Sequence, residues 1–181
     1  MAQALAGSQS AFEQIVRSYQ GAVISLIARI TGDRVLAEDL AQETFVKAFR
    51  NLAAFDTTRR LSSWLLRIAH NTAVDALRRS RPSFESIDTS AEHSGAPVEP
   101  AVPPTPDPVE QEALGRALEA ALERLRHEYR AAVALRYEQG LSFDEIGQIL
   151  GIPAVTARTH VHRARKELAR LLTASGWAPP R

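Results

Sequence analysis

Apolar residues recur at intervals of three and four along most of the chain, which is the pattern of helices that bury one face. In the first part of the chain this pattern predicts helices over about 12–30, 35–52 and 64–79. Gly32 is a suitable residue to end the first of them, and Ser62 or Ser63 can cap the third. The sequence has no alternating strand pattern and no Asn-Gly or Asp-Gly hairpin turn, so this part is expected to be helical.

The rest of the chain divides into a proline-rich segment and a second helical part. Residues 80–110 hold seven of the ten prolines and few large apolar residues, so this segment cannot bury enough surface to fold alone. Beyond it, helices are expected over about 109–126 and 128–138. The chain is therefore predicted to be all-α, with two small helical domains at 1–79 and 111–175. A flexible linker at 80–110 joins them, and a tail at 176–181 follows.

Charge is distributed unevenly between these parts. The formal net charge of +1 arises because residues 1–79 carry +3, residues 80–110 carry −5 and residues 111–181 carry +3. Two basic domains suit a polyanion such as nucleic acid, although ordinary solvated helix surface would account for charges of this size. The acidic linker could shield the basic domains when nucleic acid is absent.

The most informative local pattern is a helix-turn-helix over 141–168. Ser142 and Glu145 have the spacing of a capping box, so a helix of about two turns is expected to start at Phe143. Gly151 can supply the left-handed residue of a tight turn, and Pro153 suits the opening of the next helix. The small residue Gly147 would allow the two helices to cross closely. A short helix, a glycine turn and a longer basic helix together form this motif.

The second helix of the motif carries the side chains suited to reading DNA. It has a net charge of +4 between 153 and 170, and the N-terminal half of such a helix normally faces base edges in the major groove. Arginine can pair bidentately with guanine, and threonine can bond several bases. The candidate base-reading residues are Arg158, Thr159, His162 and Arg163. Residues further along this helix could only hold phosphates.

Several function classes are disfavoured. Cysteine is absent, which removes disulfides, zinc–thiolate sites, Fe–S clusters and thiol nucleophiles. His160 and His162 are two residues apart on a predicted helix and cannot form the usual i, i+4 metal pair. Neither a nucleophile elbow nor a phosphate-binding glycine loop is present. No catalytic residue, metal or cofactor is therefore expected.

The sequence also lacks the features of a membrane or secreted protein. No apolar stretch approaches the roughly 20 residues that are needed to span a bilayer. The N-terminus lacks a basic region followed by a long apolar run, so no signal peptide is expected. These observations predict a cytoplasmic protein without membrane insertion.

Two segments of the first part carry a family resemblance. Residues 39–49 (DLAQETFVKAF) closely resemble the polymerase-binding helix of the sigma-70 superfamily, and residues 61–79 resemble its promoter-melting helix. Residues 12–29 are similar to the helix that opens the same domain, and residues 136–168 to the C-terminal domain of the family. Two such domains with only a linker between them resemble the extracytoplasmic-function type. The resemblance implies a transcription initiation factor that directs RNA polymerase to specific promoters, recognises their −35 and −10 elements and assists their melting.

The resemblance also implies three sets of site residues. The polymerase-binding set is Asp39, Gln42 and Glu43, which fall on the side of their helix away from its apolar line. The set for the −10 element and promoter melting is Arg59, Arg60, Arg67, Asn71, Arg78 and Arg79. The set for the −35 element is Arg158, Thr159, His162 and Arg163. Residues 51–63 match the loop that captures a flipped base of the −10 element.

The expected partners follow from the same resemblance. They are core RNA polymerase, promoter DNA and an anti-sigma factor, with no small-molecule substrate. Such a protein would be a specificity subunit without its own catalytic site. The main alternative is a helix-turn-helix regulator that acts without polymerase. An enzyme, or a mimic that sequesters a sigma factor's inhibitor, are further alternatives, and the retained basic helices argue against the mimic.

Overall fold

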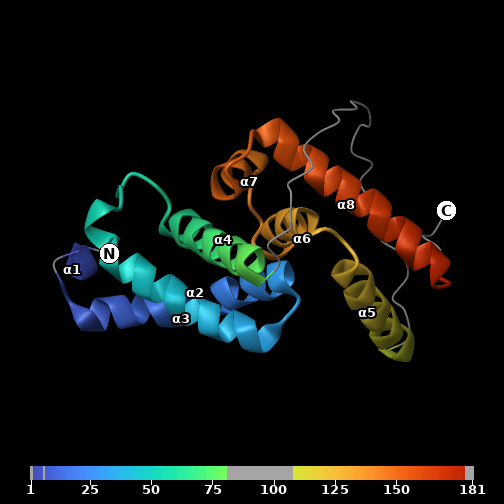
Figure 1. Ribbon diagram of the computed structural model, residues 1–181, viewed down its shortest axis with the longest axis horizontal. Coiled ribbons are helices and arrows are strands. Elements are labelled where there is room, and N and C mark those ends of the chain that lie inside the picture. Colours follow the sequence, from blue (N-terminus) through green and yellow to red (C-terminus); the bar gives the residue numbers. More distant parts are fainter. Residues whose placement is uncertain (1, 6, 81–107, 178–181) are drawn as a thin grey trace.

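The computed structural model describes residues 2–5, 7–80 and 108–177 (Figure 1). Residues 81–107 of the predicted linker and residues 178–181 of the predicted tail therefore lie outside the described residues. Within the described residues the chain is helical and has no strand, so the expectation of an all-α fold is confirmed. The elements are α1 (Ala2–Leu5), α2 (Gln9–Thr31), α3 (Arg34–Arg50), the 3-10 turn η1 (Leu52–Ala54), α4 (Leu61–Ser80), α5 (Pro108–Glu123), α6 (His127–Val133), the π-helical turn η2 (Ala134–Glu138), α7 (Phe143–Leu150) and α8 (Ala154–Ala174).

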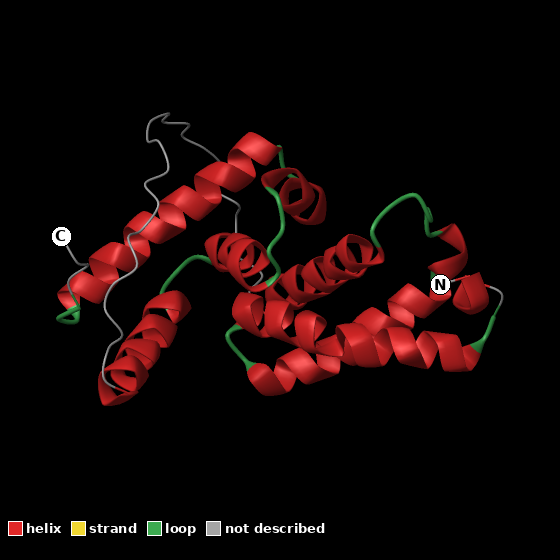
Figure 2. Cartoon of the chain, turned by 180° about the vertical axis from the view of Figure 1, so that it is seen from behind, coloured by secondary structure: helices red, strands yellow, loops and turns green. Residues whose placement is uncertain are grey.

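The first domain is a bundle of α2, α3 and α4, which pack against one another (Figure 2). Its interior is formed by side chains at three- and four-residue spacing, such as Leu26, Ile27 and Leu65, which are at most 1% exposed. Thr44 and Thr72 are the buried polar residues of the described part, and the Thr44 hydroxyl donates to the Leu40 carbonyl at 2.8 Å. The apolar face of each predicted helix is therefore the face that packs.

The start of α4 differs from the prediction. The helix begins at Leu61, three residues earlier than expected, and Ser62 and Ser63 lie inside its first turn. The carbonyl of Arg60 already accepts the helical hydrogen bond from the Trp64 amide at 3.2 Å, so Arg60 takes the capping position. The prediction that Ser62 or Ser63 caps this helix is therefore wrong.

The second domain consists of α5 to α8, with α6 and α7 both packed against α8. The predicted capping box is present: the Ser142 hydroxyl accepts from the Glu145 amide, and the Glu145 carboxylate accepts from the Ser142 amide at 2.9 Å. Gly151 has a φ of 71°, a left-handed conformation that is strained for residues with a side chain. The local signals in the sequence therefore predicted the helix-turn-helix correctly.

Gly147 of α7 lies against the backbone of the turn and the start of α8. A β-carbon at this position would be 2.7 Å from the carbonyl oxygen of Ile152 and 3.2 Å from the amide nitrogen of Ala154. Both are backbone atoms, one in the turn and one in the first residue of α8, and they cannot move aside as a flexible side chain could. The expectation that a small residue is required here is confirmed.

Replacing Gly147 with alanine is expected to lower the free energy of unfolding by about 1–3 kcal/mol, the usual cost of overpacking. Gly115 is a matched control, because it is also helical but has nothing within 4 Å of its added β-carbon. Gly115→Ala is expected to raise the free energy of unfolding by up to about 1 kcal/mol, since alanine favours helix. Urea denaturation measures both, and equal effects of the two substitutions would contradict this interpretation.

The two domains pack directly against each other. α4 lies against α7, and α2 lies against α6 (Figure 1). Buried side chains of the second domain, including Leu135, Ile146 and Ile149, belong to the same continuous core as Leu26 and Leu65 of the first. The described domains therefore form a closed arrangement, which had not been predicted from the sequence.

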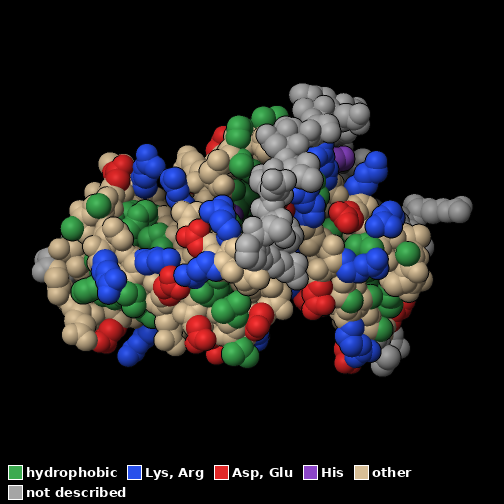
Figure 3. Space-filling model, viewed as in Figure 1, with side chains coloured by type: hydrophobic (Ala, Val, Ile, Leu, Met, Phe, Trp, Pro, Cys, Tyr) green, Lys and Arg blue, Asp and Glu red, His purple; other side chains and the backbone are tan. Residues whose placement is uncertain are grey.

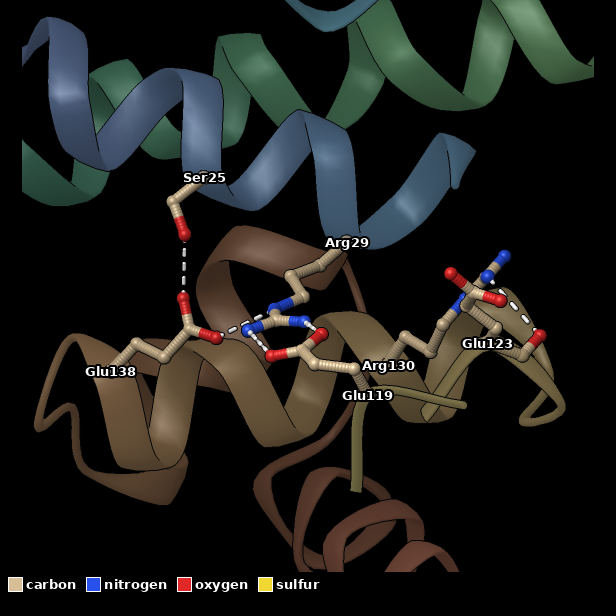
Figure 4. Close-up of polar contacts among 6 residues, drawn as sticks. All are labelled: Ser25, Arg29, Glu119, Glu123, Arg130 and Glu138. Atoms are coloured by element: carbon tan, nitrogen blue, oxygen red, sulfur yellow. Dashed lines mark hydrogen bonds and ion pairs between the residues drawn. The ribbon is translucent and has the colours of Figure 1, made fainter. Parts of the chain in front are cut away.

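A polar cluster around Arg29 joins the same two domains (Figure 4). The Arg29 guanidinium, from α2, forms a two-pronged ion pair with Glu119 of α5 and donates to Glu138 of η2 at 2.8 Å. Ser25 also donates to Glu138, at 2.6 Å. The hydrogen bond from Arg29 lowers the pKa of Glu119, which keeps the pair charged. One side chain of the first domain thus contacts two elements of the second.

Candidate protein and nucleic-acid interfaces

The exposed face of α3 carries the three residues predicted to bind a protein partner. Asp39 and Gln42 are exposed, and Glu43 is half-buried, with its carboxylate 2.8 Å from the Lys47 ammonium. Lys47 also donates to the buried Thr72 hydroxyl at 3.2 Å, which links Glu43 to α4. The opposite face of α3 is buried in the bundle. The structure therefore places these three side chains together on one accessible ridge.

Three apolar residues on the same helix were missed by the sequence reasoning. Val35, Val46 and Phe49 are 76%, 48% and 55% exposed. Together with Asp39 and Gln42 they are spaced by four, three, four and three residues, so they form one stripe along α3. Exposed apolar side chains in such a stripe are typical of a surface that receives a partner helix. The signal was present in the sequence as a second apolar line beside the buried one.

The loop before α4 presents two of the predicted DNA-binding arginines. Arg59 and Arg60 are exposed, and Asp56 orders the loop by accepting from the Thr58 hydroxyl at 2.7 Å and from the Thr58 amide at 3.0 Å. These hydrogen bonds lower the pKa of Asp56. Trp64 follows the loop and packs beside Phe55, with ring centroids 5.1 Å apart. The aromatic pair therefore holds the end of the loop against the first domain.

The remaining members of the −10 set lie on α4. Arg67 and Asn71 are exposed one turn apart, and Arg78 and Arg79 are exposed in the last turn. The Arg78 guanidinium lies 3.9 Å from Asp75, a distance that leaves it able to exchange this partner for a phosphate. The structure thus brings these side chains to the surface of one helix.

The four predicted base-reading residues lie in the first half of α8, and Figure 3 shows basic side chains over the region of this helix. Arg158 and His162 are exposed, whereas Thr159 and Arg163 are half-buried. The Thr159 hydroxyl donates to the Val155 carbonyl at 3.0 Å, so it must leave this bond before it donates to a base. Arg158 and His162 are therefore the most accessible members of the set.

The closed arrangement involves two of these DNA-binding candidates. Arg60 forms an ion pair with Glu145, the capping residue of α7, at 2.7 Å. Arg67 lines a shallow cavity with the residues of the helix-turn-helix turn, including Gly151 and Pro153. Arg60 and Arg67 therefore lie at the edge of the contact between the two domains, where both remain exposed.

Three histidines line a cavity of about 700 Å³ between the two domains. His70 comes from α4, His127 from α6 and His160 from α8, where its ring lies edge-on to Tyr129. Burial lowers the pKa of all three, and the nearby Arg126 lowers those of His127 and His160 further. In the described part, no three His, Asp or Glu side chains are arranged to hold a metal. The lowered pKa values favour the neutral form of these three rings at the domain boundary.

The free energy of unfolding is expected to decrease as the pH is lowered from about 7.5 to about 5.5. A histidine whose pKa is lowered by folding binds fewer protons in the folded state than in the unfolded state, so acid favours unfolding. Asp56 and Glu119, whose pKa values are also lowered, lose their contribution to the free energy of unfolding only at lower pH. Changing His70, His127 and His160 to glutamine is expected to flatten this dependence in urea denaturation. An equally steep pH dependence in the triple variant would contradict the assignment of this effect to the three histidines.

The comparisons with known proteins cover nearly the whole chain. The sigma-70 region 2 family model matches residues 15–82, and the sigma-70 region 4 model matches residues 115–168. The ECF RNA polymerase sigma factor SigW of Bacillus subtilis is 36% identical over 171 residues, which is 92% of this chain and 91% of SigW. The RNA polymerase sigma factor CarQ of Myxococcus xanthus is 37% identical over 166 residues, with 92% and 91% covered.

Two solved structures have a similar fold. CnrH, solved in complex with the cytosolic domain of CnrY, matches with a TM-score of 0.67 at 28% identity over 96% of this chain and 94% of CnrH. The sigma factor RpoE of Bartonella quintana, solved with the anti-sigma factor NepR, matches with a TM-score of 0.68 at 26% identity. That match covers 90% of this chain and 97% of RpoE. The chain belongs to the sigma-70 family and, within it, to the extracytoplasmic-function sigma factors.

Proposed function

We propose that this protein binds core RNA polymerase and directs it to specific promoters, where it recognises the −35 and −10 elements and assists melting. The observation that carries the proposal is the combination, in one extracytoplasmic-function sigma chain, of the accessible ridge on α3 and a basic helix-turn-helix. A regulator that acts without polymerase has no use for that ridge.

Each surface has a distinct role in this proposal. Asp39, Gln42 and Glu43 contact the polymerase, and the apolar members of the α3 stripe extend that contact. Arg59, Arg60, Arg67, Arg78 and Arg79 hold backbone phosphates at the −10 element, while Asn71 contacts bases. Arg158, Thr159, His162 and Arg163 read the −35 element in the major groove. The loop over 51–63 receives the flipped base.

The domain at 1–79 binds polymerase and the −10 element, and the domain at 111–175 binds the −35 element. Residues 80–110 are the linker, and residues 176–181 are the tail. Promoter binding requires them to separate, because α4 packs against α7 and Arg60 is paired with Glu145. The −10 and −35 elements lie apart along the duplex, so one closed unit cannot reach both. Polymerase and DNA together provide the interactions that replace this interface.

The protein acts as a specificity subunit without its own catalytic site, cofactor or small-molecule substrate, and it works in the cytoplasm. Among the described residues, no helix is long and apolar enough to cross a bilayer. An anti-sigma factor holds the protein inactive. Support for this comes from CnrH and the Bartonella RpoE, which were solved with protein partners and match most of this chain.

Run-off transcription tests the proposal. Purified bacterial core polymerase is incubated with this protein and genomic fragments that include its own upstream region. We expect discrete transcripts that appear only when the protein is present. An absence of such transcripts, together with tight binding of the isolated protein to duplex DNA, would favour a regulator that acts alone.

A further inference from the structure

Two arginines of the second domain share one aromatic ring. The guanidinium carbon of Arg158 lies 5.2 Å from the centroid of the Phe143 ring, and that of Arg136 lies 4.9 Å from it. Phe143 is the first residue of α7, is half-buried and packs against the core, so its ring is fixed in place by the core. Both distances are within the range of cation–π contacts.

Arg136 is itself fixed. Its guanidinium donates to the Leu141 carbonyl at 2.8 Å, which ties the turn before α7 to η2. Arg158, by contrast, is exposed. Its contact with the Phe143 ring restricts the motion of the Arg158 side chain.

This contact suits an arginine that reads a base. Stacking uses the flat face of the guanidinium, whereas bidentate pairing with guanine uses the N–H groups along its edge. A contact between the Phe143 ring and the guanidinium face leaves the N–H donors along the edge available. Much of the rotamer freedom that a long side chain would lose on binding is already lost in the free protein.

We propose that Phe143 is a positioning residue for promoter recognition: it orients Arg158 for its −35 base, and Arg136 supports the ring in that orientation. The inference rests on the proposed function and adds to it a specificity-determining residue outside the recognition helix. Phe143 acts through Arg158 and does not itself read DNA.

The test uses the full chain with core polymerase and a promoter library randomised in the −35 element. For each variant, the ratio of transcription from the preferred promoter to that from its single-base substitutions is measured. Arg158→Ala identifies the base pair that Arg158 reads. Phe143→Leu is expected to reduce discrimination at that base pair by about two- to fivefold, the loss typical of an exposed cation–π contact.

Three further variants separate positioning from stability. Phe143→Tyr keeps an aromatic face and is expected to retain discrimination. The double variant Phe143→Leu/Arg158→Ala is expected to discriminate no worse than Arg158→Ala, because the two residues act as one unit. Leu150→Ala removes a half-buried side chain of α7 that lies outside this stack, and is expected to lower transcription from all library members equally.

Two results would overturn the inference. Discrimination in Phe143→Leu could match that of the unaltered protein, or the variant could lose transcription uniformly, as expected for Leu150→Ala. A third result would instead contradict the proposed function. In that case the unaltered protein would support transcription from no promoter in the library, so no −35 base would be read at all.

Discussion

Replacing Asp39, Gln42 and Glu43 together with alanine is expected to weaken binding to core RNA polymerase by at least about 100-fold. The three side chains lie on one accessible ridge of α3, and central polar residues of a protein interface each contribute about 2 kcal/mol or more when they are hot spots. Titration of fluorescently labelled protein with core polymerase measures the affinity directly.

A control variant separates this effect from a general loss of exposed polar side chains. Glu13, Gln14 and Gln20 are exposed polar residues of α2, and their replacement with alanine removes one acid and two amides instead of two acids and one amide. This control is expected to bind polymerase as the unaltered protein does. Both triple variants should retain their helical circular dichroism. Equal binding by the ridge variant and the control would place the polymerase contact elsewhere.

Removing the five arginines at 59, 60, 67, 78 and 79 is expected to reduce the salt dependence of promoter binding by the polymerase complex. Each phosphate contact contributes about 0.7–0.9 to the slope of log K against log salt. If all five contact phosphates, the slope should fall by about 4, with a large loss of affinity at physiological salt. Binding measured over a series of potassium chloride concentrations gives this slope.

The control for this experiment removes two arginines that lie outside the predicted DNA-binding set. Arg116 and Arg124 are exposed basic residues in and just after α5, far from the predicted DNA-binding set in the sequence. Replacing both with alanine is expected to leave the slope unchanged. The effect of Asn71→Ala should differ again, with lower affinity for the preferred −10 sequence and an unchanged slope. A slope that does not fall in the five-arginine variant would show that these side chains do not hold phosphates.

The helix-turn-helix could be predicted because its signals are local. Ser142, Glu145 and Gly151 act on backbone groups within a few residues, and Gly147 is required by a backbone contact only five residues away. The α4 start was less predictable, because serine is common both at caps and within first turns. The first helical hydrogen bond of α4 is accepted by the backbone carbonyl of Arg60. Every residue has such a carbonyl, so the residue type at this position does not indicate where the helix begins.

The contact between the domains could not be predicted from the sequence. Arg29 contacts Glu119 and Glu138 at sequence separations of 90 and 109 residues. The periodicity of apolar residues indicates that a helix face is buried but does not show which element covers it. The linker composition predicts a tether and gives no preferred arrangement of the domains it joins. The three histidines line the cavity between the domains, so the surroundings that lower their pKa values could not be predicted from the sequence either.

The candidate interfaces were predicted in part. The exposed positions of Asp39, Gln42, Arg158 and His162 agree with the expectation from the sequence. The exposed Val46 and Phe49 were overlooked because one apolar line already accounted for the packing of α3. The contact between Phe143 and Arg158 joins two helices across a turn, and residue spacing alone does not predict which side chains stack.

The most direct test of the account compares three samples on one promoter fragment: this protein alone, core polymerase alone and the two together. Binding is measured in the presence of heparin, and strand opening near the −10 element is detected by the reactivity of unpaired thymines. We expect a heparin-resistant, open and sequence-specific complex only when both components are present. Sequence-specific binding by the protein alone, without strand opening when polymerase is added, would contradict the account.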